Sequence, residues 1–180
     1  MTYDEVMARD WRPEIVRMVQ IKQAISETDA EGIWEFHLPR VAATSEAHAA
    51  VEIALGLRLD PEYREFLGYA DGWPSFFQSV DLFGVEDLCG GPRMDIARQM
   101  LTAVEPAVLE QAGLRDVRLL PIAATTVDLD LFVMPVVDGG QEPPVVWLAG
   151  YEVDRFETFE DFALAMIEYN ARELAALTGR

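Results

Sequence analysis

Apolar side chains recur every three to four positions in two stretches of the first third of the chain, as in helices that bury one face. The first stretch runs from Pro13 to Ile25. The second follows a cap at Thr44 or Ser45 and ends at Gly56, a residue type that often closes a helix in the left-handed conformation. We therefore expect an N-terminal helix and a second helix ending at Gly56.

A short third helix is predicted directly after the second. Asp60 has the side chain of a good N-cap, and Pro61 suits the first helical position. Tyr63 and Phe66 then fall at helical spacing, so this helix would present an aromatic face to a core. The pair Asp71-Gly72 is a stop signal, after which Trp73–Phe77 is expected to form an aromatic loop.

The pattern changes in the second half, where β-branched runs alternate with turn residues. Strands are expected at Ser79–Phe83, Val117–Thr125, Leu129–Val137, Val145–Leu148 and Val153–Phe156, with a turn at Asp138–Gly140. Helices are expected at Ile96–Val104, at Pro106–Ala112 and after a cap at Thr158. Sequential strands with short turns favour an α+β fold: a mostly antiparallel sheet of about four to six strands, flanked by helices. We divide the chain into an N-terminal helical extension, residues 1–43, and one domain, residues 44–180.

Composition and charge exclude several classes of binding partner and several kinds of site. The chain has 180 residues, 51% of them hydrophobic, and a net charge of −18. Nucleic acids and anionic membranes need clustered Lys and Arg, so neither is an expected partner. The single cysteine, Cys89, excludes an internal disulfide and a multi-cysteine zinc site. No signal-like segment or long apolar run is found, so we expect a cytoplasmic protein.

The negative charge is concentrated in two stretches. Asp60–Asp87 has a net charge of −6 and Asp128–Asp161 of −8, together −14 of the total −18. If the two stretches meet in space, they form an acidic face that would attract a basic protein. The alternative is a solvated surface that keeps the protein soluble.

Candidate catalytic residues are few. His37 and His48 lie in no metal-binding pattern, and no serine is flanked by the glycines of a nucleophile elbow. Asp128 and Asp130 could hold a divalent cation with Asp138 or Glu142, as in a metal-dependent hydrolase, but no spacing fixes a third ligand. We predict no catalytic residue, no metal site and no cofactor.

Trp73, Phe76 and Phe77 lie within five residues in a segment bounded by acids. They either cap the core or act as the aromatic anchors of a binding surface. Taken with the acids around them and with the Asp128 region, they give a predicted partner-binding set. Its members are Asp71, Trp73, Phe76, Phe77, Asp81, Glu86, Asp87, Asp128 and Asp130.

The segment from Leu55 to Leu67, followed by Ala70-Asp71-Gly72-Trp73, resembles the signature of the SUKH superfamily. That signature is a helix ending in Leu-Gly, a cap, a Tyr-x-x-Phe-Leu helix and an Asn/Asp-Gly-Trp turn. The resemblance extends over roughly residues 45–169. The superfamily also includes fungal cell-wall-assembly regulators linked to killer-toxin resistance. Asp60 stands where the family usually has proline, with Pro61 displaced by one position.

The resemblance implies a SUKH-like α+β fold without enzymatic activity. Bacterial members are commonly cytoplasmic immunity proteins that bind and neutralise a polymorphic or contact-dependent toxin, often a nuclease. A nuclease needs a basic surface for its substrate, which an acidic protein can occupy. The alternative is a regulatory or scaffolding module of the same fold, suggested by the extension that the resemblance does not cover.

Overall fold

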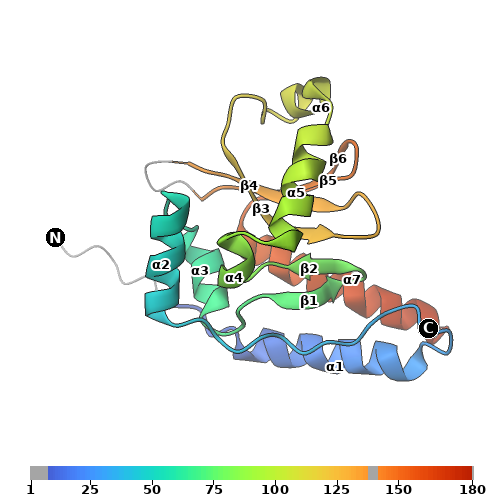
Figure 1. The fold of residues 1–180 in the computed structure, drawn as a ribbon. Coiled ribbons are helices and arrows are strands. Elements are labelled where there is room, and N and C mark those ends of the chain that lie inside the picture. Colours follow the sequence, from blue (N-terminus) through green and yellow to red (C-terminus); the bar gives the residue numbers. More distant parts are fainter. Residues whose placement is uncertain (1–7, 138–141, 180) are drawn as a thin grey trace.

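The computed structural model describes residues 8–137 and 142–179, so the predicted turn at Asp138–Gly140 lies outside the described residues. Helices and strands follow one another along the chain as labelled in Figure 1. Their order is α1 (Arg12–Thr28), α2 (Ser45–Leu55), α3 (Pro61–Leu67), β1 (Trp73–Phe77), β2 (Val80–Leu82), α4 (Val85–Leu88), α5 (Pro92–Ala103), α6 (Pro106–Gln111), β3 (Leu119–Thr125), β4 (Leu131–Pro135), β5 (Val145–Leu148), β6 (Glu152–Phe156) and α7 (Phe159–Leu177). None of these helices is both long enough and apolar enough to cross a membrane.

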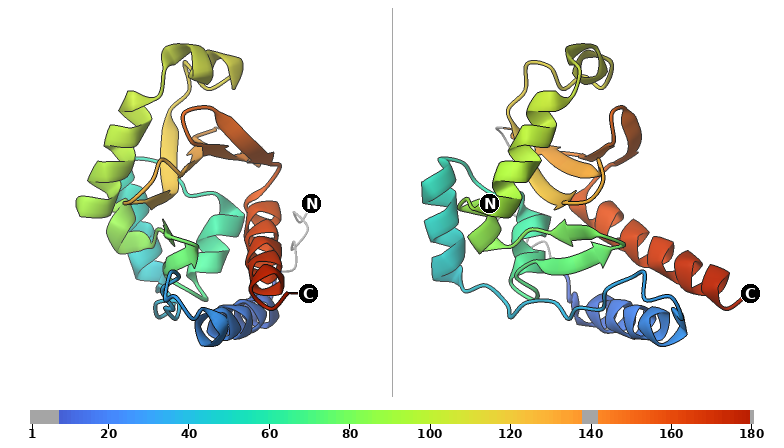
Figure 2. Two further views of the ribbon diagram at one scale, coloured as in Figure 1. Left: turned by 90° about the vertical axis from the view of Figure 1, so that its right-hand side faces the viewer. Right: turned by 45° about the vertical axis from the view of Figure 1, so that its right-hand side comes forward.

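The six strands form one antiparallel sheet in which each strand pairs with its neighbours in sequence. The predicted α+β fold with a mostly antiparallel sheet is therefore confirmed. All five residues of β4 are buried, as expected for a central strand covered on both faces. Helix α5 contacts β3 and β4, whereas α7 contacts β1 and β6, and the left view of Figure 2 places these two helices on opposite sides of the sheet.

The segment Trp73–Phe77 is strand β1, so the predicted aromatic loop is wrong. Trp73 pairs with Leu82 and Phe77 with Val80, with an irregularity between the two pairs. The backbone at Ser75 has a φ of 50° there, which interrupts the alternation of a regular strand. The prediction failed because Trp-Pro-Ser-Phe-Phe shows no period-two pattern and contains a proline, both of which argue against a strand.

Local capping signals were predicted correctly. The Asp60 carboxylate accepts a hydrogen bond from Tyr63 N at 2.9 Å, and Gly56 ends α2 with a φ of 64°. Thr158 caps α7 by accepting from Asp161 N at 3.1 Å. These caps fix where α2, α3 and α7 begin or end.

Helix α1 packs along α7, as Figures 1 and 2 show. Trp11 and Met18 are buried in the same core cluster as the sheet residues. The Trp11 ring meets Phe66 edge-on at a centroid distance of 5.2 Å. Farther along α1, the buried Lys22 ammonium donates a hydrogen bond to the carbonyl of Ser75 in β1. The N-terminal helix is thus tied to α3, α7 and β1.

Candidate protein-interaction surface

The three aromatic residues of the predicted binding set lie in the core. Trp73, Phe76 and Phe77 are all buried, and the Phe76 ring lies 6.0 Å from that of Phe162. The Trp73 indole nitrogen donates to the carbonyl of His37 at 2.9 Å, which holds the segment before α2 along β1. The rings therefore pack in the core and do not form the aromatic anchors of a binding surface, because almost none of their surface is exposed.

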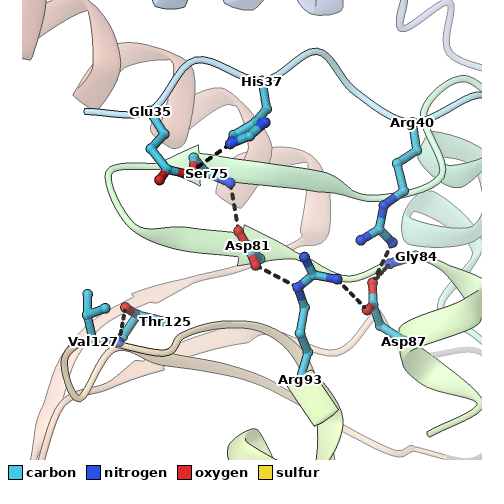
Figure 3. Close-up of polar contacts among 10 residues, drawn as sticks. All are labelled: Glu35, His37, Arg40, Ser75, Asp81, Gly84, Asp87, Arg93, Thr125 and Val127. Carbon is cyan, nitrogen blue, oxygen red and sulfur yellow. Dashed lines mark hydrogen bonds and ion pairs between the residues drawn. The ribbon is translucent and has the colours of Figure 1, made fainter. Parts of the chain in front are cut away.

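Asp81 and Asp87 belong to an ion-pair network (Figure 3). Asp81 accepts from Ser75 N at 2.7 Å and from the Arg93 guanidinium at 2.7 Å. Asp87 accepts from Arg40 at 2.7 Å, from Arg93 at 3.3 Å and from Gly84 N at 3.1 Å. The two carboxylates thereby join β1, β2, α4, α5 and the segment before α2.

Asp71 also has a local structural role. Its carboxylate accepts from Val85 N at 2.7 Å, which positions the start of α4. Gly84 lies so close that a Cβ there would collide with the carbonyl oxygen of Asp71. Burial raises the pKa of the Asp71 carboxyl, while the hydrogen bond from Val85 and the charge of Arg40 oppose the rise. The Asp-Gly-Trp turn of the sequence signature therefore helps to pack the start of α4 against the chain that precedes β1.

The other predicted acids are more open to solvent. Glu86 and Asp128 are exposed, and Asp130 is half-buried. Asp130 accepts a hydrogen bond from the Trp147 indole nitrogen at 2.7 Å. Burial raises the pKa of the Asp130 carboxyl, and this hydrogen bond works against the rise. Asp128 and Asp130 lie in the turn between β3 and β4.

The predicted binding set is split between two ends of the sheet. Asp71 precedes β1 and Asp87 follows β2, so both lie at the end where β1 begins. Asp128 and Asp130 lie at the opposite end, beside the β1–β2 turn, because Val80 pairs with Thr125. Figure 3 shows this separation, with Asp87 and Val127 at opposite ends of the β1–β2 hairpin. The sequence could not reveal the split, because it depends on the pairing of β2 with β3.

Sequence reasoning missed Arg40 and Arg93, the two cations of the ion-pair network. Arg40 is 47 positions from Asp87, so no local spacing links the two residues. Arg93 is six positions from Asp87 and twelve from Asp81, beyond the i,i+4 spacing at which helix pairs are recognised. The signal that the sequence offered was the excess of seven acids over one base in Asp60–Asp87.

Among residues 8–137 and 142–179, no group of three His, Cys, Asp or Glu side chains is arranged to hold a metal ion. Asp138, one of the further ligands considered with Asp128 and Asp130, lies outside the described residues. In the described part of the chain, Asp130 is instead engaged by Trp147.

The fold and the Asp-Gly-Trp turn define a class of small α+β protein with a meandering antiparallel sheet. Residues 42–164 match the model of the SMI1 / KNR4 family (SUKH-1). Because the match covers more than half of the chain, the protein belongs to this family. The match begins after α1 and ends within α7, close to the limits of the resemblance seen in the sequence. No curated protein matches the chain.

Proposed function

We propose that the protein is a non-catalytic immunity protein, which neutralises a cognate toxin in the cytoplasm by binding to it. Membership of the SMI1 / KNR4 family (SUKH-1) carries this proposal, since bacterial members of the wider superfamily commonly act in this way. The net charge of −18 adds the expected chemistry of the partner, which is a basic protein such as a nuclease domain.

Inhibition needs no chemical step in this proposal. The immunity protein covers the basic surface on which the toxin would otherwise bind its polyanionic substrate. Long-range attraction between opposite charges accelerates the encounter, and close packing at the interface slows dissociation. The buried Trp73, Phe76 and Phe77 support this function only through the stability of the fold, so the contact is assigned to exposed side chains.

The experiment uses the product of the gene that neighbours the gene for this chain, tested as the candidate toxin. Co-expression with the chain is expected to restore growth of cells that produce the toxin, and the two purified proteins are expected to form a complex. The control is an unrelated toxin of the same activity, which the chain should not neutralise. If growth is not restored and no complex forms, the proposed function is wrong.

A further inference from the structure

Three hairpin turns gather at one end of the sheet. They join β1 to β2 at Gln78 and Ser79, β3 to β4 at Thr126–Asp130, and β5 to β6 at Ala149–Tyr151. Val80 pairs with Thr125, and Leu131 pairs with Leu148, so each turn lies beside the next. In Figure 1 these turns all lie at the same end of the strands, on the right of the view. We call these residues the hairpin-tip surface.

Large apolar side chains are exposed on the hairpin-tip surface. Val127 is 78% exposed, Leu129 61% and Tyr151 63%. Hairpin turns are usually built from Gly, Asn, Asp, Ser and Pro, so Val127 and Leu129 are not explained by the requirements of the turn. They also contribute little to the core, because most of their surface faces solvent. Apolar groups that stand together on a surface indicate a site of contact with another molecule.

The β3–β4 turn is held in one shape by polar contacts at its base. Thr125 N donates to Asp130 O at 3.0 Å, and Val127 N donates to Thr125 Oγ1 at 3.2 Å. Thr125 Oγ1 also lies 3.0 Å from Ser79 Oγ of the neighbouring turn. With Asp130 anchored to Trp147, the turn presents Val127 in a fixed position. A preorganised contact loses less conformational freedom on binding than a mobile loop would.

Acidic groups lie on the hairpin-tip surface and next to it. Asp128 stands exposed between Val127 and Leu129. Glu173 of α7 accepts a hydrogen bond from Gln78 at 3.0 Å, and Asp154 of β6 accepts from the hydroxyl of Tyr169 at 3.2 Å. Arg172 of α7 stacks over the Tyr169 ring, whereas Arg155 of β6 is paired with Glu152 at 2.7 Å and also donates to the carbonyl of Ala112. An apolar centre with an acidic rim complements a basic surface that contains an apolar depression.

We propose that the hairpin-tip surface is the docking face for the toxin, with Val127 and Leu129 as its central contacts. This inference rests on the proposed function and adds where the basic partner binds. A second copy of the chain fits the face less well, because both copies carry the same acidic rim and a net charge of −18. Of the predicted acids at the other end of the sheet, Asp87 belongs to the ion-pair network, Asp71 accepts from Val85 N, and Glu86 alone is exposed.

The test compares exposed apolar side chains at the two ends of the sheet. The double variant Val127→Ser/Leu129→Ser removes the proposed contacts, and Leu38→Ser is the matched control. Leu38 is also 61% exposed, but it lies near the opposite end of the sheet, where Arg40 N bonds to Gly72 O. The probe is the toxin encoded beside the gene, made inactive by substitution of a catalytic residue. The double variant should weaken the Kd by about 100-fold or more, and Leu38→Ser by less than about threefold.

Unchanged urea midpoints for both variants show that the fold is intact. In the complex, amides of residues 126–130 and 149–151 should gain protection from hydrogen exchange. If wild type binds the toxin and the double variant binds it equally well, this inference is wrong while the proposed function stands. Weaker binding by Leu38→Ser alone also overturns it, as does a wild-type dimer that the double variant abolishes. If wild type does not bind the toxin, both proposals fail.

Discussion

Single carboxylates in this protein differ in role even when they are adjacent in the chain. Asp87 is 8% exposed and accepts hydrogen bonds from three segments through Gly84, Arg40 and Arg93. Glu86, the preceding residue, is exposed. A buried charge is stable only when it is paired, and removal of one partner leaves the others without compensation. The two residues therefore contribute equally to the net charge but very differently to the fold.

We predict that Asp87→Ala lowers the free energy of unfolding by about 2–4 kcal/mol, because it leaves Gly84 N and the Arg40 guanidinium without this acceptor and Arg93 with Asp81 alone. Glu86→Ala, which removes the same charge one position away, should change it by less than about 0.5 kcal/mol. Urea unfolding near neutral pH measures both. Equal effects of the two substitutions would show that the ion-pair network does not stabilise the protein.

Helix α3 illustrates what a local sequence signal determines. Asp60 caps the helix through Tyr63 N, as its position before Pro61 predicted. The structure adds that burial raises the pKa of the Asp60 carboxyl to about 6, although the hydrogen bond from Tyr63 opposes the rise and nearby Glu62 and Glu142 reinforce it. Near neutral pH, the cap is therefore a charged group in an unfavourable environment.

We predict that Asp60→Asn stabilises the protein near pH 7 by about 1–2 kcal/mol, since asparagine keeps the cap without the charge. A carboxyl with a raised pKa in the folded state binds its proton more tightly there than in the unfolded chain. Its contribution to stability is complete below the unfolded value of about 4 and is lost as the pH rises through about 6. The advantage of Asp60→Asn should thus disappear at pH 4, which urea unfolding at the two pH values will show.

Helix α1 lies outside the residues that match the family model, but it contributes buried side chains to the core. Trp11 is 1% exposed and contacts Phe66 of α3 and Phe159 of α7. The apolar spacing of residues 13–25 predicted the helix but could not show where it packs, because Trp11 precedes the periodic stretch. The sequence therefore predicts that residues 1–43 are an extension, whereas in the structure α1 buries side chains against the domain.

Substitution of Trp11 measures how far α1 belongs to the fold. We predict that Trp11→Ala lowers the free energy of unfolding by about 3–5 kcal/mol, as expected when a buried aromatic is removed. Val16→Ala, on an exposed position of the same helix, should cost less than about 0.5 kcal/mol. Thermal and urea unfolding should give a single transition for both variants. A small effect of Trp11→Ala would mean that α1 is a dispensable extension.

The features that the sequence predicted depend on interactions between residues close in the chain, whereas those that it missed depend on residues far apart in the chain. The caps at Thr44, Asp60 and Thr158 depend on residues within three positions, and all were placed correctly. The ion pairs of Asp81 and Asp87 with Arg40 and Arg93 depend on the fold, and the sequence did not predict them. The sequence predicts a strand that begins at Leu129 and leaves Val127 in the turn before it. It does not indicate that both side chains are exposed, because a periodic pattern does not show which end of a strand meets solvent.

At the scale of the whole molecule, the net charge of −18 acts through the solvent rather than through any one contact. Pairing within the chain, as in the Asp81–Arg93–Asp87 network, removes local charge of both signs and leaves the net value unchanged. The whole surface therefore attracts a basic partner over about 10 Å at moderate salt, the distance at which ions screen the field. Attraction of this kind acts before contact and accelerates association.

We predict that the association rate constant with the basic partner falls at least about tenfold between about 20 and about 300 mM salt, while the dissociation rate changes little. The physical reason is that screening weakens the long-range field but scarcely affects close packing in the formed complex. Stopped-flow mixing with the inactivated toxin measures both rates. Asp128→Asn should lower the association rate at low salt and have a smaller effect at high salt. Asp95→Asn removes the same charge from α5, outside the hairpin-tip surface, and controls for the loss of one charge. An association rate that is independent of salt would show that the acidity of this protein serves solubility alone.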